Sequence, residues 1–316
     1  MHLNFDRNLF YTISMSLLVV GSMAFDDIET PFGKATRVVG GAGTYICYAA
    51  SFFTPNIGVV SVVGEDFDMG IIADLNQRGV NTDGVQVKVG EKSFFWSGKY
   101  HLDMNTRDTL DTQLNVLADF NPVVPPAMKD AQFVLLGNLT PTVQRQVIEQ
   151  MNQRPRLIAM DTMNFWMTAM PDELAKTIGM VDLLMVNDEE ARQLSGEYSL
   201  VRAARKIRAM GPKYLVIKKG EHGALLFHED NVFFAPALPL EEVFDPTGAG
   251  DTFAGGFMGY LAQHGDISFE AMRKAVIHGS AMASFCVEKF GIDRLEALKQ
   301  AELTERQAQF AALVTY

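Results

Sequence analysis

The residues from 245 to 256, DPTGAGDTFAGG, combine a glycine-rich turn with an aspartate at the start of an expected helix. Gly248, Ala249 and Gly250 are small enough for the backbone to approach a ligand closely. The first N–H groups of a helix have no partner inside it, and the helix dipole is positive at that end, so the turn could bind phosphate. Asp251 would then lie beside the phosphate, where a carboxylate can accept the proton of an attacking hydroxyl. The alternative is a structural turn whose aspartate only stabilises the helix start.

Other phosphate-binding motifs fail in this chain. The P-loop pattern GxxxxGK[ST] does not occur. Gly41-Ala42-Gly43 follows two valines, but the third glycine of a GxGxxG motif would fall on Ile46. A dinucleotide-binding turn is therefore disfavoured there.

The elements that must position this turn alternate along the chain. Short, continuous apolar runs predict strands buried on both faces, at 17–20, 57–63, 133–136, 157–160, 183–186 and 214–217. Helical patterns are expected at 140–153, 200–210, 250–263, 269–287 and 294–312. Strands alternating with helices predict an α/β fold with a mainly parallel sheet covered on both faces.

Two segments interrupt this alternation. Residues 25–39 are polar and contain a proline and a glycine, and 85–105 includes the strand-like run KSFFWSGKY. They could pair as a small sheet outside the main one, or form a hairpin at its edge. The aromatic residues Phe94, Phe95 and Trp96 would serve a ligand in the first case or pack in a small core in either.

Composition excludes several classes of protein. The 316 residues are 48% hydrophobic and 21% charged, a balance typical of folded globular chains. With 27 Lys and Arg against 38 Asp and Glu, the net charge is −11, which disfavours non-specific nucleic-acid binding. Cys47 and Cys286 lie far apart among apolar neighbours, so neither a disulfide framework nor a metal cluster is expected.

The sequence also bears on membrane attachment, cellular location and the N-terminal segment. No apolar run reaches the roughly 20 residues of a membrane span, and no signal peptide is recognisable, so we expect no membrane attachment and a reducing, cytoplasmic location. Residues 1–14 are polar and irregular before Met15 and the first apolar run. We therefore expect a disordered N-terminal extension at 1–14 and one domain at 15–316.

The motif DPTGAGDTF at 245–253 closely resembles the C-terminal signature of the PfkB, or ribokinase-like, carbohydrate kinases. The resemblance covers nearly the whole chain from Met15. It includes GGAG at 40–43, NDEE at 187–190, which is similar to the family's Asn-x-x-Glu element, and KKGEHG at 218–223, which is similar to the strand and glycine turn of the nucleotide site. The resemblance implies a three-layer α/β/α domain with a small β-sheet lid, formed here by the segments near 25–39 and 85–105.

The resemblance also implies roles for individual residues. Asp251 would deprotonate the acceptor hydroxyl, and the backbone N–H groups of Gly248, Ala249 and Gly250 would form the anion hole for the γ-phosphoryl of ATP. The residues implied for the nucleotide are Asn187, Lys218, Gly220, Gly223, His278 and Met282. Glu190 would organise Mg²⁺ through water, and Asp245 and Thr247 resemble positions that hold a monovalent cation, usually K⁺. From the residues alone, Asn187 could equally be a helix cap and Glu190 solvated surface.

The acceptor is a sugar or nucleoside in this family. The positions implied for it are Asp26, Gly40, Gly41, Ala42, Tyr45, Asn138 and Arg107. The ribokinase motif GGKGxN has Ala42 and Tyr45 in place of its Lys and Asn, and Leu139 replaces an acidic residue beside Asn138. Two polar sugar contacts are thus missing, which favours a less hydroxylated acceptor such as a nucleoside. Arg107 could address an anionic acceptor or belong to a solvated loop.

Three functions remain at this point. The favoured one is an ATP- and Mg²⁺-dependent sugar or nucleoside kinase. A binding protein of the same fold without turnover would not need Asp251, and a dinucleotide-dependent oxidoreductase is disfavoured by the failed GxGxxG motif. Related kinases often pair through their lids, so a homodimer formed by the aromatic lid segment is also expected.

Overall fold

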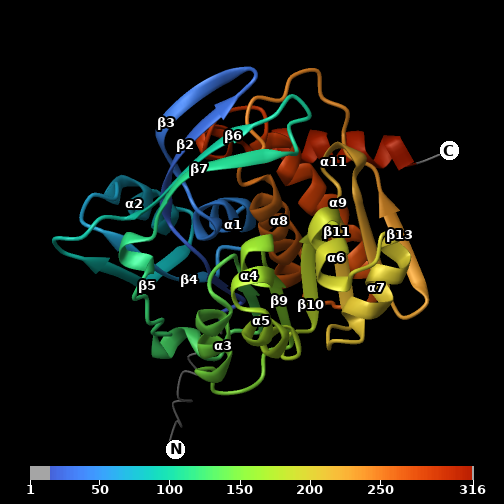
Figure 1. Ribbon diagram of the computed structural model, residues 1–316, viewed down its shortest axis with the longest axis horizontal. Coiled ribbons are helices and arrows are strands. Elements are labelled where there is room, and N and C mark those ends of the chain that lie inside the picture. The colour runs from blue at the N-terminus through green and yellow to red at the C-terminus, as the bar shows by residue number, and fades with distance from the viewer. Residues whose placement is uncertain (1–14, 315–316) are drawn as a thin grey trace, which may run out of the picture.

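The computed structural model describes residues 15–314, which form a nine-stranded sheet and a separate four-stranded sheet (Figure 1). Along the large sheet the strands lie in the order β13-β12-β11-β10-β9-β8-β1-β4-β5. Neighbouring strands from β11 to β5 are parallel, while β12 and β13 are antiparallel at one edge. The bounds are β1 (Leu17–Val20), β4 (Ile57–Gly64), β5 (Val80–Lys88), β8 (Phe133–Leu136), β9 (Leu157–Asp161), β10 (Leu183–Asn187), β11 (Tyr214–Lys218), β12 (Ala224–His228) and β13 (Asn231–Ala235). The mainly parallel α/β sheet expected from the alternation is confirmed.

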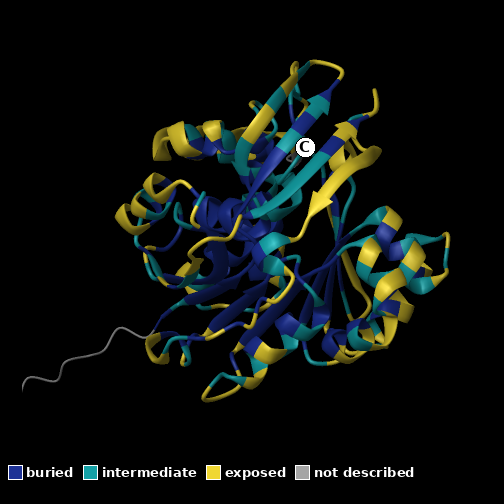
Figure 2. Cartoon of the chain, turned by 60° about the vertical axis from the view of Figure 1, so that its left-hand side comes forward, coloured by how far each residue is buried: buried dark blue, intermediate teal, exposed yellow. Residues whose placement is uncertain are grey.

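Helices cover both faces of this sheet, because successive strand residues point to opposite sides. Leu17 and Val19 belong to the core on one face, and Leu18 and Val20 to the core on the other. The first face carries α1 (Ala42–Ala50), α2 (Met69–Gln77), α8 (Ala249–His264), α9 (Phe269–Cys286), α10 (Asp293–Ala297) and α11 (Gln300–Val314). The second carries α3 (Pro141–Glu149), α4 (Asn164–Ala169), α5 (Pro171–Ile178), α6 (Asp188–Ser195) and α7 (Leu200–Arg208), together with the short turns Asn115–Leu117 and Pro126–Met128. Figure 2 shows the buried strands between these two partly exposed helical layers.

The apolar runs located the strands well, and their ends differ in an instructive way. Strands β9, β10 and β11 each continue one residue beyond the apolar run, to Asp161, Asn187 and Lys218. The apolar side chains end where the strand leaves the core, whereas the backbone pairing continues for one more residue. The extra residue in each strand is polar and lies at the carboxyl edge of the sheet.

Two helix predictions were wrong in extent. The helix after Pro141 ends at Glu149 rather than near residue 153. The single helix expected at 294–312 is two helices, because Leu298 adopts an extended backbone with ψ 138°. The Glu302 side chain accepts the N–H of Lys299 at 3.0 Å at the start of α11, which stabilises the new helix end.

The four-stranded sheet, called the lid below, projects from the carboxyl edge of the large sheet (Figure 1). Its order is β3 (Gly33–Gly40), β2 (Ala24–Thr30), β6 (Phe94–Tyr100) and β7 (Arg107–Gln113). Of the two alternatives, a small separate sheet or a hairpin at the edge of the main sheet, the separate sheet is the one that forms. Residues 85–88 do not belong to it, since they continue β5 of the main sheet, and Arg107, which could have belonged to a solvated loop, begins β7.

Several expectations concern the ends and the surface. The extension at 1–14 lies outside the described residues. Among residues 15–314 no helix has the length and apolar character needed to cross a bilayer. Cys47 and Cys286 are both buried and unpaired with each other, as reduced core thiols would be.

Candidate active site

Polar residues form a row where the parallel strands end. Lys218 and Asn187 are register partners at the ends of β11 and β10, and Asp161 ends β9. Asn138 follows β8, the next strand along the sheet. Carboxyl ends of parallel strands are the usual place for ligand sites in open α/β sheets. The row therefore marks the floor of the candidate site.

The start of α8 faces this row. Gly248 caps the helix with a left-handed backbone, φ 74°, and a Cβ atom there would lie 2.4 Å from carbons of the Tyr45 ring. Glycine is thus required both by conformation and by space. Among the described residues, no acceptor faces the N–H groups of Gly250 and Asp251, which leaves both available to an anion.

Ala249 departs from the expectation. Its N–H donates to the Pro246 carbonyl at 3.2 Å. Of the three expected donors the Ala249 N–H is therefore engaged, whereas among the described residues the N–H groups of Gly248, Gly250 and Asp251 have no hydrogen-bond partner.

Asp251 lies in the first turn of α8 and is half-buried. Burial and the nearby negative charge of Asp161 raise its carboxyl pKa to about 7, although the positive charges of Lys218 and Arg107 oppose the rise. A carboxylate with a pKa near neutrality is well matched to accept and release a proton at neutral pH.

Lys218 supplies positive charge beside the same turn. Its Nζ atom lies 2.5 Å from Asp161 Oδ2, and a Cβ atom at Gly250 would lie 2.9 Å from that Nζ. Burial alone would lower the lysine pKa, but the carboxylates of Asp161, Glu190 and Asp251 raise it. Lys218 is therefore charged, and its ammonium lies at the edge of the anion-binding turn.

Asn187 and Glu190 form a capping box at the start of α6. The Asn187 side chain accepts the Glu190 N–H at 2.7 Å, and Glu190 Oε2 accepts the Asn187 N–H at 2.7 Å. Asn187 is therefore a helix cap, as one of its two interpretations predicted. Glu190 is buried, so it is not a solvated surface residue. Burial and Asp161 raise its carboxyl pKa to about 7. A buried carboxylate of this kind would be stabilised in its charged form by a cation.

The inner face of the lid carries the acceptor candidates. The Asp26 carboxylate lies against Gly40, where a Cβ atom would be 1.9 Å from Oδ2, and Asp26 and Trp96 are register partners in β2 and β6. The Trp96 ring lies across Gly98, where a Cβ atom would be 2.0 Å from the ring. Asp26 is only 4% exposed, and burial with the charges of Asp245 and Asp251 raises its pKa to about 8.

Gly41 and Ala42 lie beside Asp26 at the start of α1. Gly41 caps this helix with φ 90°, and the Ala42 N–H donates to Ser22 Oγ at 3.1 Å. The glycine motif therefore connects β3 to α1, packs against Gly21 and Ser22 after β1, and leaves room for the Asp26 side chain.

The lid also reaches the body of the protein. The Tyr100 and Thr247 hydroxyls lie 3.2 Å apart, and a Cβ atom at Gly220 would be 2.9 Å from Asn105 Oδ1. Arg107 is exposed at the start of β7, and its charge offsets part of the rise in the pKa values of Asp251 and Glu190. One loop of the lid thus lies near both the acceptor side and the expected nucleotide side.

Comparison with known proteins agrees with this arrangement. The model of the pfkB family of carbohydrate kinases matches residues 15–297. The chain belongs to this family. It is a phosphotransferase with an alcohol group as acceptor, of the kind that acts on sugars or nucleosides.

Three similar proteins illustrate the relationship. The cytidine kinase of Thermococcus kodakarensis is 28% identical over 248 residues, which are 77% of this chain and 87% of that protein. The nucleoside kinase of Burkholderia thailandensis in complex with ADP-inosine superposes with a TM-score of 0.74 at 22% identity, covering 95% of this chain and 96% of the other. A putative ribokinase II from E. coli in complex with ATP and Mg²⁺ gives a TM-score of 0.75 at 18% identity, covering 93% and 99%. Both structures support the fold of this kinase.

The remaining nucleotide candidates divide into two groups. Gly220 and Gly223 flank a short turn after β11 with φ 53° and 81°, beside Lys218. His278 instead stacks on Tyr260 of α8, with ring centroids 4.2 Å apart, and contacts Gln307 of α11 at 2.8 Å. Met282 packs against Gly256 of α8. The last two side chains therefore take part in helix packing, and their contact with a nucleotide stays a prediction.

Asp245 and Thr247, the positions implied for a monovalent cation, make hydrogen bonds within the protein. The two Asp245 carboxylate oxygens accept the N–H groups of Thr247 at 2.8 Å and Gly291 at 3.0 Å. The Thr247 carbonyl accepts the Cys286 thiol at 3.4 Å. No group of three or more acidic, His or Cys side chains suited to a metal occurs among the described residues.

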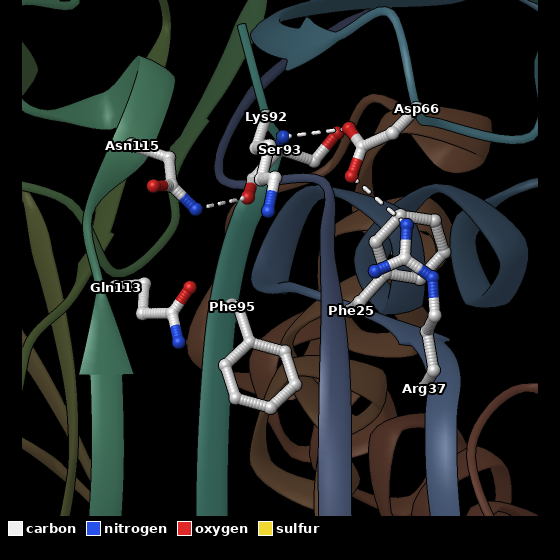
Figure 3. A pocket seen from close by; sticks show the side chains of 8 residues that line it. All are labelled: Phe25, Arg37, Asp66, Lys92, Ser93, Phe95, Gln113 and Asn115. Atoms are coloured by element: carbon white, nitrogen blue, oxygen red, sulfur yellow. Dashed lines mark hydrogen bonds and ion pairs between the residues drawn. The ribbon is translucent and has the colours of Figure 1, made fainter.

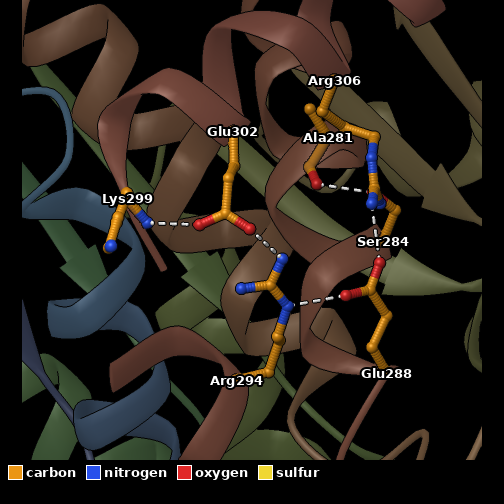
Figure 4. Close-up of polar contacts among 7 residues, drawn as sticks. All are labelled: Ala281, Ser284, Glu288, Arg294, Lys299, Glu302 and Arg306. Atoms are coloured by element: carbon orange, nitrogen blue, oxygen red, sulfur yellow. Dashed lines mark hydrogen bonds and ion pairs between the residues drawn. The ribbon is translucent and has the colours of Figure 1, made fainter. Parts of the chain in front are cut away.

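The segment that provides Gly291 is held by a charged network at the C-terminal helices (Figure 4). Arg294 and Arg306 both bind Glu288 at 2.6 Å. Arg294 also binds Glu302 at 2.7 Å. This network fixes the chain on either side of Gly291 and so supports Asp245.

Asn138 lies in a small cluster at the floor. Its Oδ1 accepts Trp166 Nε1–H at 2.9 Å, and its amide nitrogen contacts Met163 Sδ at 3.1 Å. A pocket of about 170 Å³ lies elsewhere, beside the lid strands (Figure 3). Because side chains alternate along a strand, its residues Phe25 and Phe95 lie on the lid face opposite to their neighbours Asp26 and Trp96. Phe25 and Phe95 line the pocket together with Arg37, Asp66, Lys92, Ser93, Gln113 and Asn115.

Sequence reasoning missed Asp161, Tyr100 and Trp166 as members of the site. For Asp161 a signal existed, because a carboxylate directly after a buried strand of a parallel sheet lies at the ligand-binding edge. Tyr100 was identifiable only through the lid register, and Trp166 only through its contact with Asn138.

Proposed function

We propose that this kinase transfers the γ-phosphoryl group of ATP to a hydroxyl of a nucleoside or nucleoside-like sugar, with Asp251 as the general base. The observation that carries the proposal is Asp251 in the first turn of α8, next to the unpartnered N–H groups of Gly250 and Asp251. A base and an anion site occur side by side, as in-line phosphoryl transfer requires.

In the proposed reaction the acceptor oxygen forms a bond to the γ-phosphorus while the bond between that phosphorus and the β,γ-bridging oxygen breaks, so that ADP leaves. The hydroxyl proton goes to the Asp251 carboxylate. Charge on the transferred group is stabilised by the free N–H groups at the start of α8 and by Lys218, whose Nζ lies at the edge of that turn.

Glu190 and Asn187 suit a Mg²⁺ ion that is bound partly by the protein and partly by water and nucleotide phosphates, rather than enclosed by protein ligands alone. Glu190 is a buried carboxylate with a raised pKa, and Mg²⁺ commonly binds one or two carboxylates with waters and substrate phosphates. Bound with the nucleotide, the ion would neutralise phosphate charge. A monovalent cation at Asp245 and Thr247 stays a separate prediction, since an oxygen that accepts one hydrogen bond keeps a lone pair for a cation.

The preference for a nucleoside rests on the lid. Trp96 lies flat beside Asp26, so one residue can stack on a base while the other contacts a sugar hydroxyl. Ala42 and Tyr45 provide no charged contact for extra hydroxyl groups. Relatives named as cytidine kinase and nucleoside kinase support the same acceptor class.

The test is an ADP-release screen with Mg-ATP over nucleosides, free pentoses and hexoses, and sugar phosphates. We expect a nucleoside to give the highest kcat/KM, with product mass increased by one phosphoryl group. A free sugar as the best acceptor would refute the nucleoside assignment, and no ADP release with any acceptor would refute the kinase reaction with ATP.

The homodimer stays a separate proposal. All seven residues of the edge strand β7 are exposed, including Leu110, and an exposed edge strand can pair with another chain. Light scattering of the purified protein should give twice the chain mass, and a monomer at high concentration would contradict it.

A further inference from the structure

The ion pair between Lys218 and Asp161 spans the sheet in an unusual way. Lys218 ends β11 and Asp161 ends β9, and β10 lies between these two strands. Neighbouring strands are roughly 4.8 Å apart, so the lysine side chain must extend along the sheet edge to reach its partner. The Nζ and Oδ2 atoms nevertheless lie 2.5 Å apart, and the side chains are only 17% and 8% exposed.

Asp161 is itself held firmly. Its Oδ1 atom accepts the Thr162 N–H at 2.8 Å, and its carbonyl accepts Gln144 Nε2–H at 3.0 Å. Gln144 is buried and also bonds the Gly137 carbonyl at 2.8 Å, so it ties the ends of β8 and β9 together. The carboxylate that faces Lys218 is therefore part of a rigid edge.

The position of the ammonium matters more than its charge alone. A Cβ atom at Gly250 would lie 2.9 Å from Lys218 Nζ, so the amine lies at the rim of the anion-binding turn. Lysine is a flexible point charge, and an amine held in place before the ligand arrives avoids the ordering cost on binding. Preorganised positive charge is also what stabilises a transferring phosphoryl group.

We propose that Asp161 is a positioning residue that holds the Lys218 ammonium at the rim of the anion-binding turn and keeps it from pairing with Asp251. This inference rests on the proposed function, because it assigns a phosphoryl group to that turn. Asp161 itself does not touch the transferred group.

The Asp161–Lys218 ion pair matters because other carboxylates compete for the lysine. Asp161, Glu190 and Asp251 all act on Lys218, and it is Asp161 that forms the direct bond. Without the Asp161 charge, the carboxylates that still act on the amine are those of Glu190 and Asp251. A lysine paired with Asp251 would both leave the phosphate rim and weaken the base.

The decisive experiment is a double-mutant cycle with Asp161→Asn, Lys218→Met and the combined variant. We expect Asp161→Asn to raise the KM for ATP at least fivefold and to lower kcat about 10- to 100-fold, with the KM for the acceptor changed less than twofold. Because Asp161 acts through Lys218, the combined variant should be no slower than Lys218→Met alone. Effects that multiply in the combined variant, or an unchanged KM for ATP in Asp161→Asn, would overturn the proposal.

The pH profile gives a second readout. The titratable and charged groups that interact electrostatically with Asp251 are Asp161 of β9, Lys218 of β11, Arg107 of β7, Asp26 of β2 and Cys286 of α9. Loss of the Asp161 charge should move the acidic limb of kcat to lower pH, and a limb that stays in place would contradict the competition for Lys218.

Asp182→Asn is the matched control. Asp182 also bonds a β9 residue, since its Oδ2 accepts the Ile158 N–H at 3.0 Å, and it pairs with Arg154 at 3.0 Å near the opposite end of the strand. It should leave both KM values unchanged. If Asp161→Asn does not fold by circular dichroism, Asp161→Ser replaces it in the cycle. A wild-type protein that consumes no ATP would refute the proposed function itself, whereas an active wild type with additive variants refutes only the role of Asp161.

Discussion

Replacing Asp26 by asparagine should stabilise the free protein at alkaline pH while weakening acceptor binding. Asp26 is almost fully buried, and burial together with Asp245, Asp251 and Asp27 raises its pKa from 3.8 to about 8. A carboxyl whose pKa is higher when folded binds its proton more tightly in the folded state. Its favourable contribution is complete below pH 3.8 and is lost as the pH rises through about 8.

The magnitude follows from these two values. One pKa unit corresponds to about 1.36 kcal/mol, so between pH 5 and pH 8 the Asp26 carboxyl lowers the free energy of unfolding by about 3–4 kcal/mol. Asparagine has nearly the same shape and no charge, so the variant should lose that much less stability over this range. For a chain of this size the difference corresponds to several degrees in Tm.

The assay is thermal unfolding of the ligand-free protein from pH 5 to pH 9, with the exposed Asp83→Asn as control. Asp26→Asn should flatten the fall of Tm with pH, and the control should follow wild type. At pH 9, where the Asp26 carboxyl is charged, the same variant should raise the acceptor KM at least tenfold, since a hydrogen bond to a charged group is worth about 1.5–3 kcal/mol. A Tm curve parallel to wild type would refute the account of Asp26.

Three further substitutions test other parts of the site. Gly248→Ala should lower kcat more than tenfold and reduce the free energy of unfolding by about 1–3 kcal/mol, because the added Cβ meets the Tyr45 ring. The control is Gly265→Ala at the other end of α8, where φ is 66° and the nearest contact of the added Cβ is 3.8 Å. In a melting experiment this control should show only the cost of the left-handed backbone. Trp96→Ala should raise the acceptor KM and leave the KM for ATP unchanged, whereas Phe95→Ala on the opposite lid face should change neither; equal effects would exclude stacking on Trp96. Glu190→Gln should raise the Mg²⁺ concentration for half-maximal rate, with the exposed Glu189→Gln as control; coincident titrations would remove Glu190 from the metal site.

Much of the fold followed from the pattern of apolar runs, because strands buried on both faces are continuously apolar. The same property explains the errors at the strand ends. Asp161, Asn187 and Lys218 are polar and were left outside the apolar runs, yet backbone pairing carries them into the strands and aligns them at the edge. The break at Leu298 was hidden for the opposite reason, since an apolar residue in an extended turn fits a helical pattern.

The site was predictable where local sequence determines local geometry. Gly248 and Asp251 lie within one helical turn, so their relationship follows from spacing. The ion pair of Asp161 with Lys218 joins residues 57 positions apart, and the contact of Tyr100 with Thr247 joins residues 147 apart. The stacking of His278 of α9 on Tyr260 of α8 also joins two separate helices, so position along α9 alone did not predict it.

The central claim is that Asp251 accepts the acceptor proton during phosphoryl transfer from ATP. The most direct measurement compares kcat and nucleotide affinity of wild type and Asp251→Asn with Mg-ATP and the best acceptor. We predict that kcat falls about 10²–10⁴-fold while the Kd for ATP changes less than threefold. A kcat within threefold of wild type would contradict the account.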